Sequence, residues 1–388
     1  MRAPTLGPAF DLLAAYRPPG ALFERHGIGV ATSKVREWVD PAAAVMRLRE
    51  LHGDGAGVAV GVLPFGGGGA LAIAPRSVRR TASGAGPWFV GVDEGDDTPI
   101  ERVMGGLPSD AFEGLQLHEV PSPQAYADIV ATATDRISAG ALRKVVLART
   151  IEVEAGRVLD PRRLAQRLRA VNPDAYTFAM PAVDGVLVGA SPELLVARHG
   201  REVTANPLAG SAPRAGDPDE DRANAEALRA SAKNLEEHAI VVEVVAETLR
   251  PVCDDLTWDP EPVLLETPNV WHLSTRFRGV LRDPAPSSVE LALALHPTPA
   301  VGGSPSGPAL AAIAELEPFD RRAYAGPVGW VDGDGDGEWA IALRCALLTG
   351  SRATLYAGAG IVADSDPWAE VDETDRKFRA FLDALRWG

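Results

Sequence analysis

The chain has 388 residues, of which 46% are hydrophobic and 23% are charged, which is typical of a globular protein with a large apolar core. The formal net charge of 38 − 53 = −15 argues against a nucleic-acid partner and against an anionic membrane surface. Cys253 and Cys345 are too few for a disulfide framework or a thiolate metal site, and they fit a reducing cytoplasm.

We expect no targeting signal and no membrane anchor. The N-terminal stretch 1–13 lacks a long apolar core after its basic start, unlike a signal peptide. No run of about 18 apolar residues is present that would predict a membrane-spanning helix. The sequence therefore predicts a cytoplasmic protein.

The first part of the chain, residues 1–115, is rich in Gly, Ala and Pro, and no constellation of charged residues stands out in it. Apolar runs at 57–65 and 69–75 predict strands. The glycine run 66–69 is not followed by the Gly-Lys-Ser/Thr of a phosphate-binding loop, so we expect a hairpin connection there. We interpret residues 1–115 as an N-terminal scaffold and 116–388 as the catalytic part, together forming one compact unit.

The sequence pattern changes near residue 120, where helix and strand signals begin to mix. Asp160 and Pro161 are the N-cap and first residue of one predicted helix, and Asp184-Gly185 predicts a turn. This mixture predicts an α+β fold rather than a strict βαβ repeat. The predicted elements are a helix at 122–140, a strand at 144–153, a helix at 159–173, and strands at 175–183 and 185–198.

Two ionisable residues in this region lie among apolar neighbours. Lys144 opens its strand on the same face as Val146 and Ala148, where a lysine gives up its proton more readily than in water. The alternative is a lysine at the strand mouth whose stem reaches solvent. Glu193 precedes Leu-Leu-Val, and burial there raises a carboxyl pKa, which suits a general acid. The alternative is a surface glutamate at a strand bend.

A loop and a long helix are predicted next. Residues 204–214 contain Asn-Pro, Gly210-Ser211 and a further proline, so a ligand can approach this backbone closely. Apolar stripes at helical spacing predict a helix over 219–250. Glu237 lies in line with one stripe, so it requires a cation or a metal as its partner, or else it forms a salt bridge on the helix surface.

Strand signals return after this helix. A strand is predicted over 266–281 and a short helix over 308–316. Aspartates at 332–336 resemble the start of an EF-hand, but the twelfth position is Leu343, so we expect a hairpin turn without calcium. In the strand after that turn, Arg344 alternates with alanines, which leaves space around its guanidinium for a planar anion or for an internal ion pair.

The last segment predicts a glycine-bearing strand at 356–362 and a helix that Asp366 caps. Glu370 and Glu373 are three residues apart and share a helix face, where they complement the helix dipole or form a hard-cation site. Three histidines lack a second histidine at metal-ligand spacing, so we interpret them as structural or substrate-side donors. They are His238, His272 and His296.

Nine segments in this order resemble the chorismate-utilising enzymes, and most closely the isochorismate synthases. They cover about residues 120–385, and they are specific jointly although each is ordinary alone. The segments are KVVLART (144–150), GASPELL (189–195), PLAGSAPR (207–214), KNLEEHAIVV (233–242), TPNVWHL (267–273), LHPTPAVGG (295–303), ELEPFDRRAYAGPVGW (315–330), GEWAIALRCA (337–346) and YAGAGIVADSDP (356–367).

The resemblance implies a chorismate-binding enzyme fold of two stacked sheet-plus-helix halves, with the active site between them. It implies that Lys144 is the base that activates water for attack on ring carbon C2, and that Glu193 is the acid that protonates the departing C4 hydroxyl. It implies Mg²⁺ as cofactor, held by Glu237 and Glu370 with Glu373 nearby. The residues implied to contact the substrate are Gly210, Ser211, Ala300, Val301, Tyr324, Arg344, Gly358 and Gly360.

Three activities stay open within this resemblance. Lys144 favours water as the nucleophile, because the ammonia-using relatives typically lack a lysine here. Salicylate synthases, which go on to eliminate pyruvate, tend to carry threonine where this chain has Ser211. A non-catalytic chorismate-binding relative would need neither Lys144 nor Glu193. We expect a monomeric isochorismate synthase, and the sequence leaves open whether its product feeds siderophore, menaquinone or salicylate synthesis.

Overall fold

The computed structural model describes residues 11–52, 57–80, 88–91 and 114–386. We expect no signal peptide at 1–13, and residues 1–10 of that stretch lie outside the described residues. Residues 92–113, next to the domain boundary predicted at 115, also lie outside them. Within the described ranges, no helix is long and apolar enough to cross a membrane.

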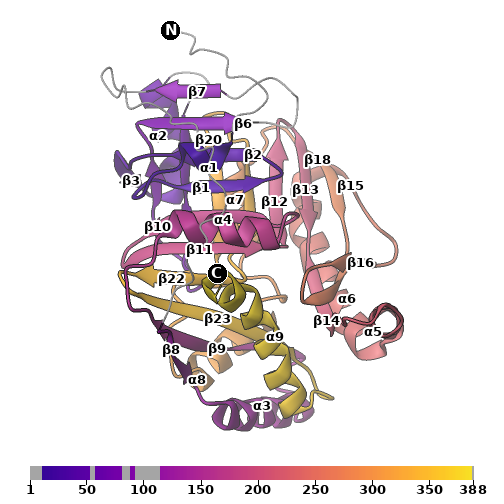
Figure 1. Ribbon diagram of the computed structural model, residues 1–388. Coiled ribbons are helices and arrows are strands. Elements are labelled where there is room, and N and C mark those ends of the chain that lie inside the picture. Colours follow the sequence, from indigo (N-terminus) through magenta and orange to yellow (C-terminus); the bar gives the residue numbers. More distant parts are fainter. Residues whose placement is uncertain (1–10, 53–56, 81–87, 92–113, 387–388) are drawn as a thin grey trace.

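The largest element is an 11-stranded sheet whose recorded strand pairings are all antiparallel, and it extends from top to bottom of Figure 1. Its order is β19 (Gly303–Ser304), β9 (Lys144–Glu154), β23 (Arg352–Ile361), β22 (Cys345–Thr349), β11 (Gly185–Ser191), β10 (Tyr176–Ala182), β1 (Leu22–Arg25), β2 (Ile28–Thr32), β6 (Arg76–Arg80) and β7 (Trp88–Gly91). The strand β8 (Gln116–Val120) also pairs with β9.

A second sheet of nine strands lies against the first, and its strands cross those of the large sheet in Figure 1. Its order is β15 (Cys253–Trp258), β18 (Phe277–Leu281), β13 (Glu202–Asn206), β12 (Leu194–His199), β21 (Gly337–Ile341), β20 (Pro327–Asp332), β4 (Val58–Val62), β5 (Leu71–Ile73) and β3 (Glu37–Val39). A small third sheet contains β14 (Leu208–Pro213), β17 (Val270–Ser274) and β16 (Val263–Glu266).

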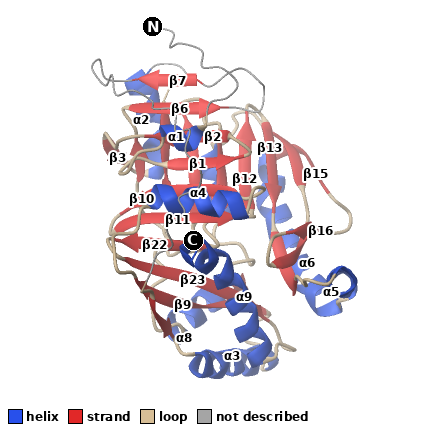
Figure 2. Ribbon diagram, in the orientation of Figure 1, coloured by secondary structure: helices blue, strands red, loops and turns tan. Residues whose placement is uncertain are grey.

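The helices cover the outer faces of these sheets, as Figure 2 shows for α4 and α9 in front of the large sheet. The helices are α1 (Leu12–Ala15), α2 (Ala44–His52), α3 (Pro123–Ser138), α4 (Pro161–Val171), α5 (Pro218–Ala230), α6 (Ala232–Leu249), α7 (Ser288–Leu295), α8 (Ser306–Leu316) and α9 (Pro367–Arg386). Two single 3₁₀ turns, Pro41–Ala43 and Arg250–Val252, adjoin α2 and α6.

Strand alternation divides the apolar side chains of the large sheet between two cores. Leu187 of β11 belongs to the core between the sheets, whereas its neighbour Val188 belongs to the core under α1, α4 and α9. Strands from the first third of the chain join both sheets, so this segment completes the same two layers that carry the rest of the fold. The predicted α+β class is confirmed.

Several local predictions are confirmed by the cap and turn geometry. The carboxylate of Asp160 accepts the Arg162 backbone N–H at 2.9 Å at the start of α4, and Asp366 accepts that of Ala369 at 2.8 Å at the start of α9. Residues 63–70 connect β4 to β5 as the expected hairpin. The aspartates at 332–336 form the β20–β21 turn, where Asp332 pairs with Arg79.

Other local predictions were wrong. The expected loop at 204–214 forms the end of β13 and all of β14, with a register shift at Gly210. The expected helix at 219–250 is two helices, because Ser231 takes an extended conformation and its hydroxyl caps α6. The strand expected over 266–281 is split between β17 and β18, which belong to different sheets. The strand expected through Arg344 ends at Ile341, and Arg344 itself has a φ of 49°.

Candidate active site

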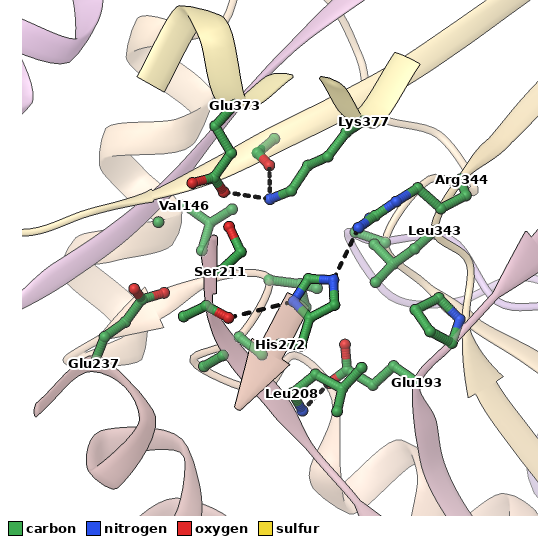
Figure 3. Close-up of a pocket in the computed structure, with 18 of the residues that line it drawn as sticks. Val146, Glu193, Leu208, Ser211, Glu237, His272, Leu343, Arg344, Glu373 and Lys377 are labelled. Carbon is green, nitrogen blue, oxygen red and sulfur yellow. Dashed lines mark hydrogen bonds and ion pairs between the residues drawn. The ribbon is translucent and has the colours of Figure 1, made fainter. Parts of the chain in front are cut away.

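A cavity at the β9–β23 end of the large sheet lies against α6, α9 and the three-stranded sheet, and Figure 3 shows labelled side chains around it from these elements and from the β11–β12 and β21–β22 connections. It contains every predicted substrate-contacting residue together with Glu193, Glu237 and Glu373. Lys144 and Glu370 do not line it. The lining residues are Val146, Pro192, Glu193, Leu208, Ala209, Gly210, Ser211, Glu237, His272, Ala300, Val301, Tyr324, Ala325, Leu343, Arg344, Gly358, Gly360, Glu373 and Lys377.

Lys144 reaches this cavity through an ion pair with one of the lining residues. Its side chain is completely buried, and its Nζ lies 2.9 Å from Oε1 of Glu237 on α6. Apart from this ion pair, Nζ has no hydrogen-bond acceptor among the described residues. Gly360 leaves room for the pair, since a Cβ there would lie 2.3 Å from the Glu237 oxygen. The partner that Glu237 requires is thus supplied by a distant strand.

Glu193 occupies the short connection between β11 and β12, where it is 3% exposed. Burial raises the pKa of Glu193 to about 7, and the Lys144 and Arg344 charges and the Leu208 backbone N–H oppose that rise. The Leu208 N–H donates to its Oε1 at 3.3 Å, which fixes the carboxyl at the cavity wall. A carboxyl that titrates near neutrality can hold a proton for delivery, so the sequence interpretation of Glu193 as an acid fits its surroundings.

Arg344 enters the cavity from the connection between β21 and β22, where the chain leaves one large sheet for the other. Its Nη2 donates to Nε2 of His272 at 3.1 Å, and the other ring nitrogen, Nδ1, lies 3.3 Å from the Gly210 carbonyl oxygen. A guanidinium has no acceptor, so Nε2 accepts and Nδ1 carries the hydrogen. Burial lowers the pKa of His272 to about 3, which keeps this ring neutral.

Tyr324 forms another wall of the cavity and is held by a second tyrosine. Its ring stacks on Tyr356 with a centroid distance of 5.1 Å and an interplanar angle of 10°. A Cβ added to Gly358 would lie 3.0 Å from the Tyr324 hydroxyl oxygen, so glycine at this position leaves space beside the hydroxyl. Tyr324 is thus placed to donate a hydrogen bond into the cavity.

Two further glutamates come from the first turns of α9, and each has a lysine partner. Glu370 Oε1 lies 3.1 Å from Lys233 Nζ, and Glu373 Oε1 lies 2.5 Å from Lys377 Nζ. The Lys377 ammonium also donates to the Gly358 carbonyl at 2.8 Å. Ser211 of β14 and Glu373 of α9 both line the cavity. Each of the three glutamates predicted to bind metal therefore has a lysine partner: Glu237 pairs with Lys144, Glu370 with Lys233 and Glu373 with Lys377.

The donor set of these glutamates fits magnesium in its chemistry. Carboxylate oxygens are the ligands that magnesium prefers, and Glu237 and Glu370 are both buried. Burial, and then the charge of Glu373, raise the pKa of Glu370 to about 6, so a bound cation would stabilise its ionised form. Within the described ranges, however, no three His, Cys, Asp or Glu side chains are already arranged around a common metal position.

Sequence reasoning missed Lys377 and gave His272 only a general role. Lys377 is four residues after Glu373, so helical spacing on α9 was a signal that could have identified it. The contact between His272 and Arg344 had no such signal, because β17 and the β21–β22 connection are far apart in the sequence. Asn234 of α6 hydrogen-bonds through Nδ2 to the Ser231 hydroxyl at 2.8 Å.

Comparison with known proteins identifies similar sequences over most of this fold. Residues 107–386 match the family model described as "Chorismate binding enzyme". The "Putative isochorismate synthase MenF" of Mycobacterium tuberculosis is 43% identical over 380 residues, which cover 95% of this chain and 96% of that protein. Isochorismate synthase DhbC of Bacillus subtilis is 45% identical over 273 residues, which cover 69% of each chain.

A solved structure has the same overall architecture. It is titled a "putative 2,3-dihydroxybenzoate-specific isochorismate synthase, DhbC from Bacillus anthracis", and its sequence is 36% identical to this chain. The superposition has a TM-score of 0.85 and covers 97% of this chain and 99% of that one. The likeness therefore includes the strands contributed by the first third of the chain.

Proposed function

Because this chain belongs to the chorismate-binding enzymes and is most similar to isochorismate synthases, which are isomerases, we propose that it converts chorismate to isochorismate with magnesium as cofactor. One observation carries this proposal. Glu193 is buried in the wall of the cavity that also holds Arg344, and the buried Lys144 lies directly behind that wall, in an ion pair with the lining residue Glu237. A protein that only bound chorismate would need neither a base nor an acid at that place.

The reaction requires help at both ends, because water is a poor nucleophile and hydroxide is a poor leaving group. Lys144 takes a proton from water as the water oxygen bonds to ring carbon C2. The ring double bonds shift, and the bond between C4 and its hydroxyl oxygen breaks. Glu193 delivers its proton to that oxygen, which leaves as water. One water enters and one leaves, so the product has the same mass as the substrate.

Lys144 must be unprotonated to act as a base, so its ion pair with Glu237 has to open during the cycle. Magnesium, when bound by Glu237 and Glu370, would neutralise part of the charge on the substrate carboxylates. Glu237 then has two alternative partners, Lys144 and the metal. Arg344 and Lys377 supply the positive charges that hold a dianion in this acidic protein, and the Tyr324 hydroxyl supplies a neutral donor.

The experiment is incubation of the purified protein with chorismate and Mg²⁺, followed by chromatography and mass measurement. We expect chorismate to be replaced by a product of equal mass and different retention. Unchanged chorismate at high enzyme concentration would indicate a binding protein and would contradict the proposal. Release of pyruvate together with salicylate would instead identify a salicylate synthase.

A further inference from the structure

A second cavity, of about 880 Å³, lies against the candidate active site. Among the described residues that line the two cavities, only Tyr324 is common to both. Small-molecule sites in proteins typically enclose about 300–1,000 Å³, so this second space is large enough for a ligand of its own. The proposed reaction uses none of its other lining residues.

The floor of this second cavity is apolar and belongs to the large sheet. Leu187 of β11 and Leu347 of β22 are direct cross-strand partners, and Tyr356 of β23 continues the same surface. The β4–β5 connection forms the opposite wall, where a Cβ added to Gly66 or Gly67 would meet nothing within 4 Å. At these two glycines the connection contributes no side chain to the space.

Aromatic and charged side chains border the cavity and define what it can hold. Trp38 lines it and is 50% exposed, which leaves a flat apolar face available to a planar ring. Arg322 is the only cation among the described lining residues, and its Nη1 already lies 2.6 Å from Asp184 Oδ2. Asp320 adds a second carboxylate. Because Arg322 is already paired and Asp320 adds a further negative charge, this cavity disfavours an anion and offers carboxylate oxygens to a ligand with a hydrogen-bond donor.

We propose that this second cavity binds an uncharged, planar aromatic molecule of about two fused rings that carries a hydroxyl or amino donor, and that its occupant changes the affinity of the active site for chorismate. The same charge argument excludes chorismate itself, because the dianion would meet Asp184 and Asp320. In the active-site cavity, by contrast, Arg344 hydrogen-bonds to the neutral His272 ring and forms no ion pair with a described carboxylate, so its charge is available to an anion.

The stacked tyrosines provide the physical connection between the two cavities. Tyr356 lines the second cavity and stacks on Tyr324, whose hydroxyl faces the Gly358 backbone in the active site. A ring bound against Tyr356 in the second cavity restricts the positions of this pair. Because Tyr324 contacts both spaces, restricting it changes the position of its hydroxyl relative to the substrate, which appears as a change in KM.

Binding is tested by calorimetry with 2-naphthol as the neutral probe and 2-naphthoate as its anionic counterpart with the same two rings. We expect 2-naphthol to bind with a 1:1 stoichiometry and at least tenfold more tightly than 2-naphthoate. The Ala182→Phe variant, which places a ring in the second cavity, should lose binding, whereas the exposed control Val158→Phe should keep it. Gly66→Trp is a second cavity variant, since Gly66 does not need a positive φ.

The assigned site would be overturned if neither probe bound, if both probes bound equally, or if both cavity variants retained binding.

The connection to the active site is tested separately, by measuring the KM for chorismate with and without saturating 2-naphthol. We expect a change of at least threefold that disappears in Ala182→Phe. An unchanged KM with 2-naphthol bound would refute the coupling. Calorimetry does not depend on turnover, so failure of the proposed activity would leave the binding result readable.

Discussion

Lys144 Nζ and Glu237 Oε1 lie 2.9 Å apart in a buried ion pair that joins the first residue of β9 to α6. This pair connects two proposed roles, base catalysis by Lys144 and magnesium binding by Glu237. Glu237 holds the charge of Lys144 in this structure and is also a candidate magnesium ligand. Metal binding and release of the lysine for base catalysis are therefore expected to be linked through one carboxylate.

Replacing Lys144 by Gln should abolish the addition of water but still allow the addition of ammonia, which is a stronger nucleophile. We expect turnover of chorismate to fall by about 10² to 10⁴, the usual contribution of a general base. Added ammonium should give some aminated product, because ammonia attacks without a base. The measurement is product chromatography with and without ammonium, together with a thermal melt to confirm folding. Hydration by Lys144→Gln at a rate near that of the native enzyme would place the base elsewhere.

Glu193 should give the enzyme a pH limit on its alkaline side. Its pKa is raised to about 7 by burial, so the proton it must deliver is lost as pH rises through that value. We expect kcat/KM to decrease about tenfold per pH unit above about 7. Glu193→Gln should lose both hydration and amination at every pH. A profile for the native enzyme that stays flat to pH 9 would contradict this role.

The same pKa predicts a stability signature for Glu193. The pKa of Glu193 is higher in the folded protein than its ordinary value of 4.5, so folding favours the protonated carboxyl. The stability that this protonation contributes is fully present below pH 4.5 and is lost as pH rises from about 4.5 through 7. Glu193→Gln carries no such charge, so it should gain unfolding free energy relative to the native protein above pH 7. Denaturant titrations of both proteins at pH 5 and pH 8 provide the measurement.

Magnesium should be required, and Glu370 should be needed to hold it. We expect Glu370→Ala to abolish turnover, because it removes a buried carboxylate ligand, while the overall fold stays intact. Calorimetric titration with Mg²⁺ should show weaker binding by this variant. The matched control on the same helix is Asp372→Ala, whose side chain is exposed. Full native activity in excess chelator would refute the magnesium requirement.

The product should be isochorismate with little salicylate at neutral pH. Ser211, Ala300 and Val301 all line the cavity. The resemblance to the family implies threonine at the Ser211 position in salicylate synthases. The measurement is a pyruvate assay run in parallel with chorismate consumption. Pyruvate formed in a stoichiometric amount would show that the reaction continues to salicylate.

His272 should act by positioning Arg344 rather than by titrating. His272→Leu removes the acceptor for a charged donor, a bond worth about 1.5–3 kcal/mol, so we expect KM for chorismate to rise roughly 10- to 100-fold. His272→Gln keeps an acceptor and should recover part of that loss. Because the pKa of His272 is lowered to about 3, its contribution should be constant between pH 5 and 8. Equal KM values for the Leu and Gln variants would contradict the positioning role.

Local sequence signals succeeded where neighbouring residues decide the structure. The Asp160 and Asp366 caps are determined within one helical turn, and the apolar alternation of 144–153 agrees with β9. The same signals failed at 219–250 and at 337–347. In the first segment a cap at Ser231 interrupts continuous helix propensity, and in the second the chain changes sheets at Arg344.

The sequence by itself determined the chemical inventory of this protein, because motif order and residue type are properties of the chain. Lys144, Glu193, Arg344 and the glutamates could all be named from it as candidates, and the family comparison confirms the family that the motifs resemble. Only the tertiary structure decided which charged groups pair and with which partners. The pairs Lys144–Glu237, Lys233–Glu370 and Arg344–His272 each join elements far apart in sequence. Such contacts depend on how sheets and helices pack in three dimensions, and no local periodicity encodes that packing.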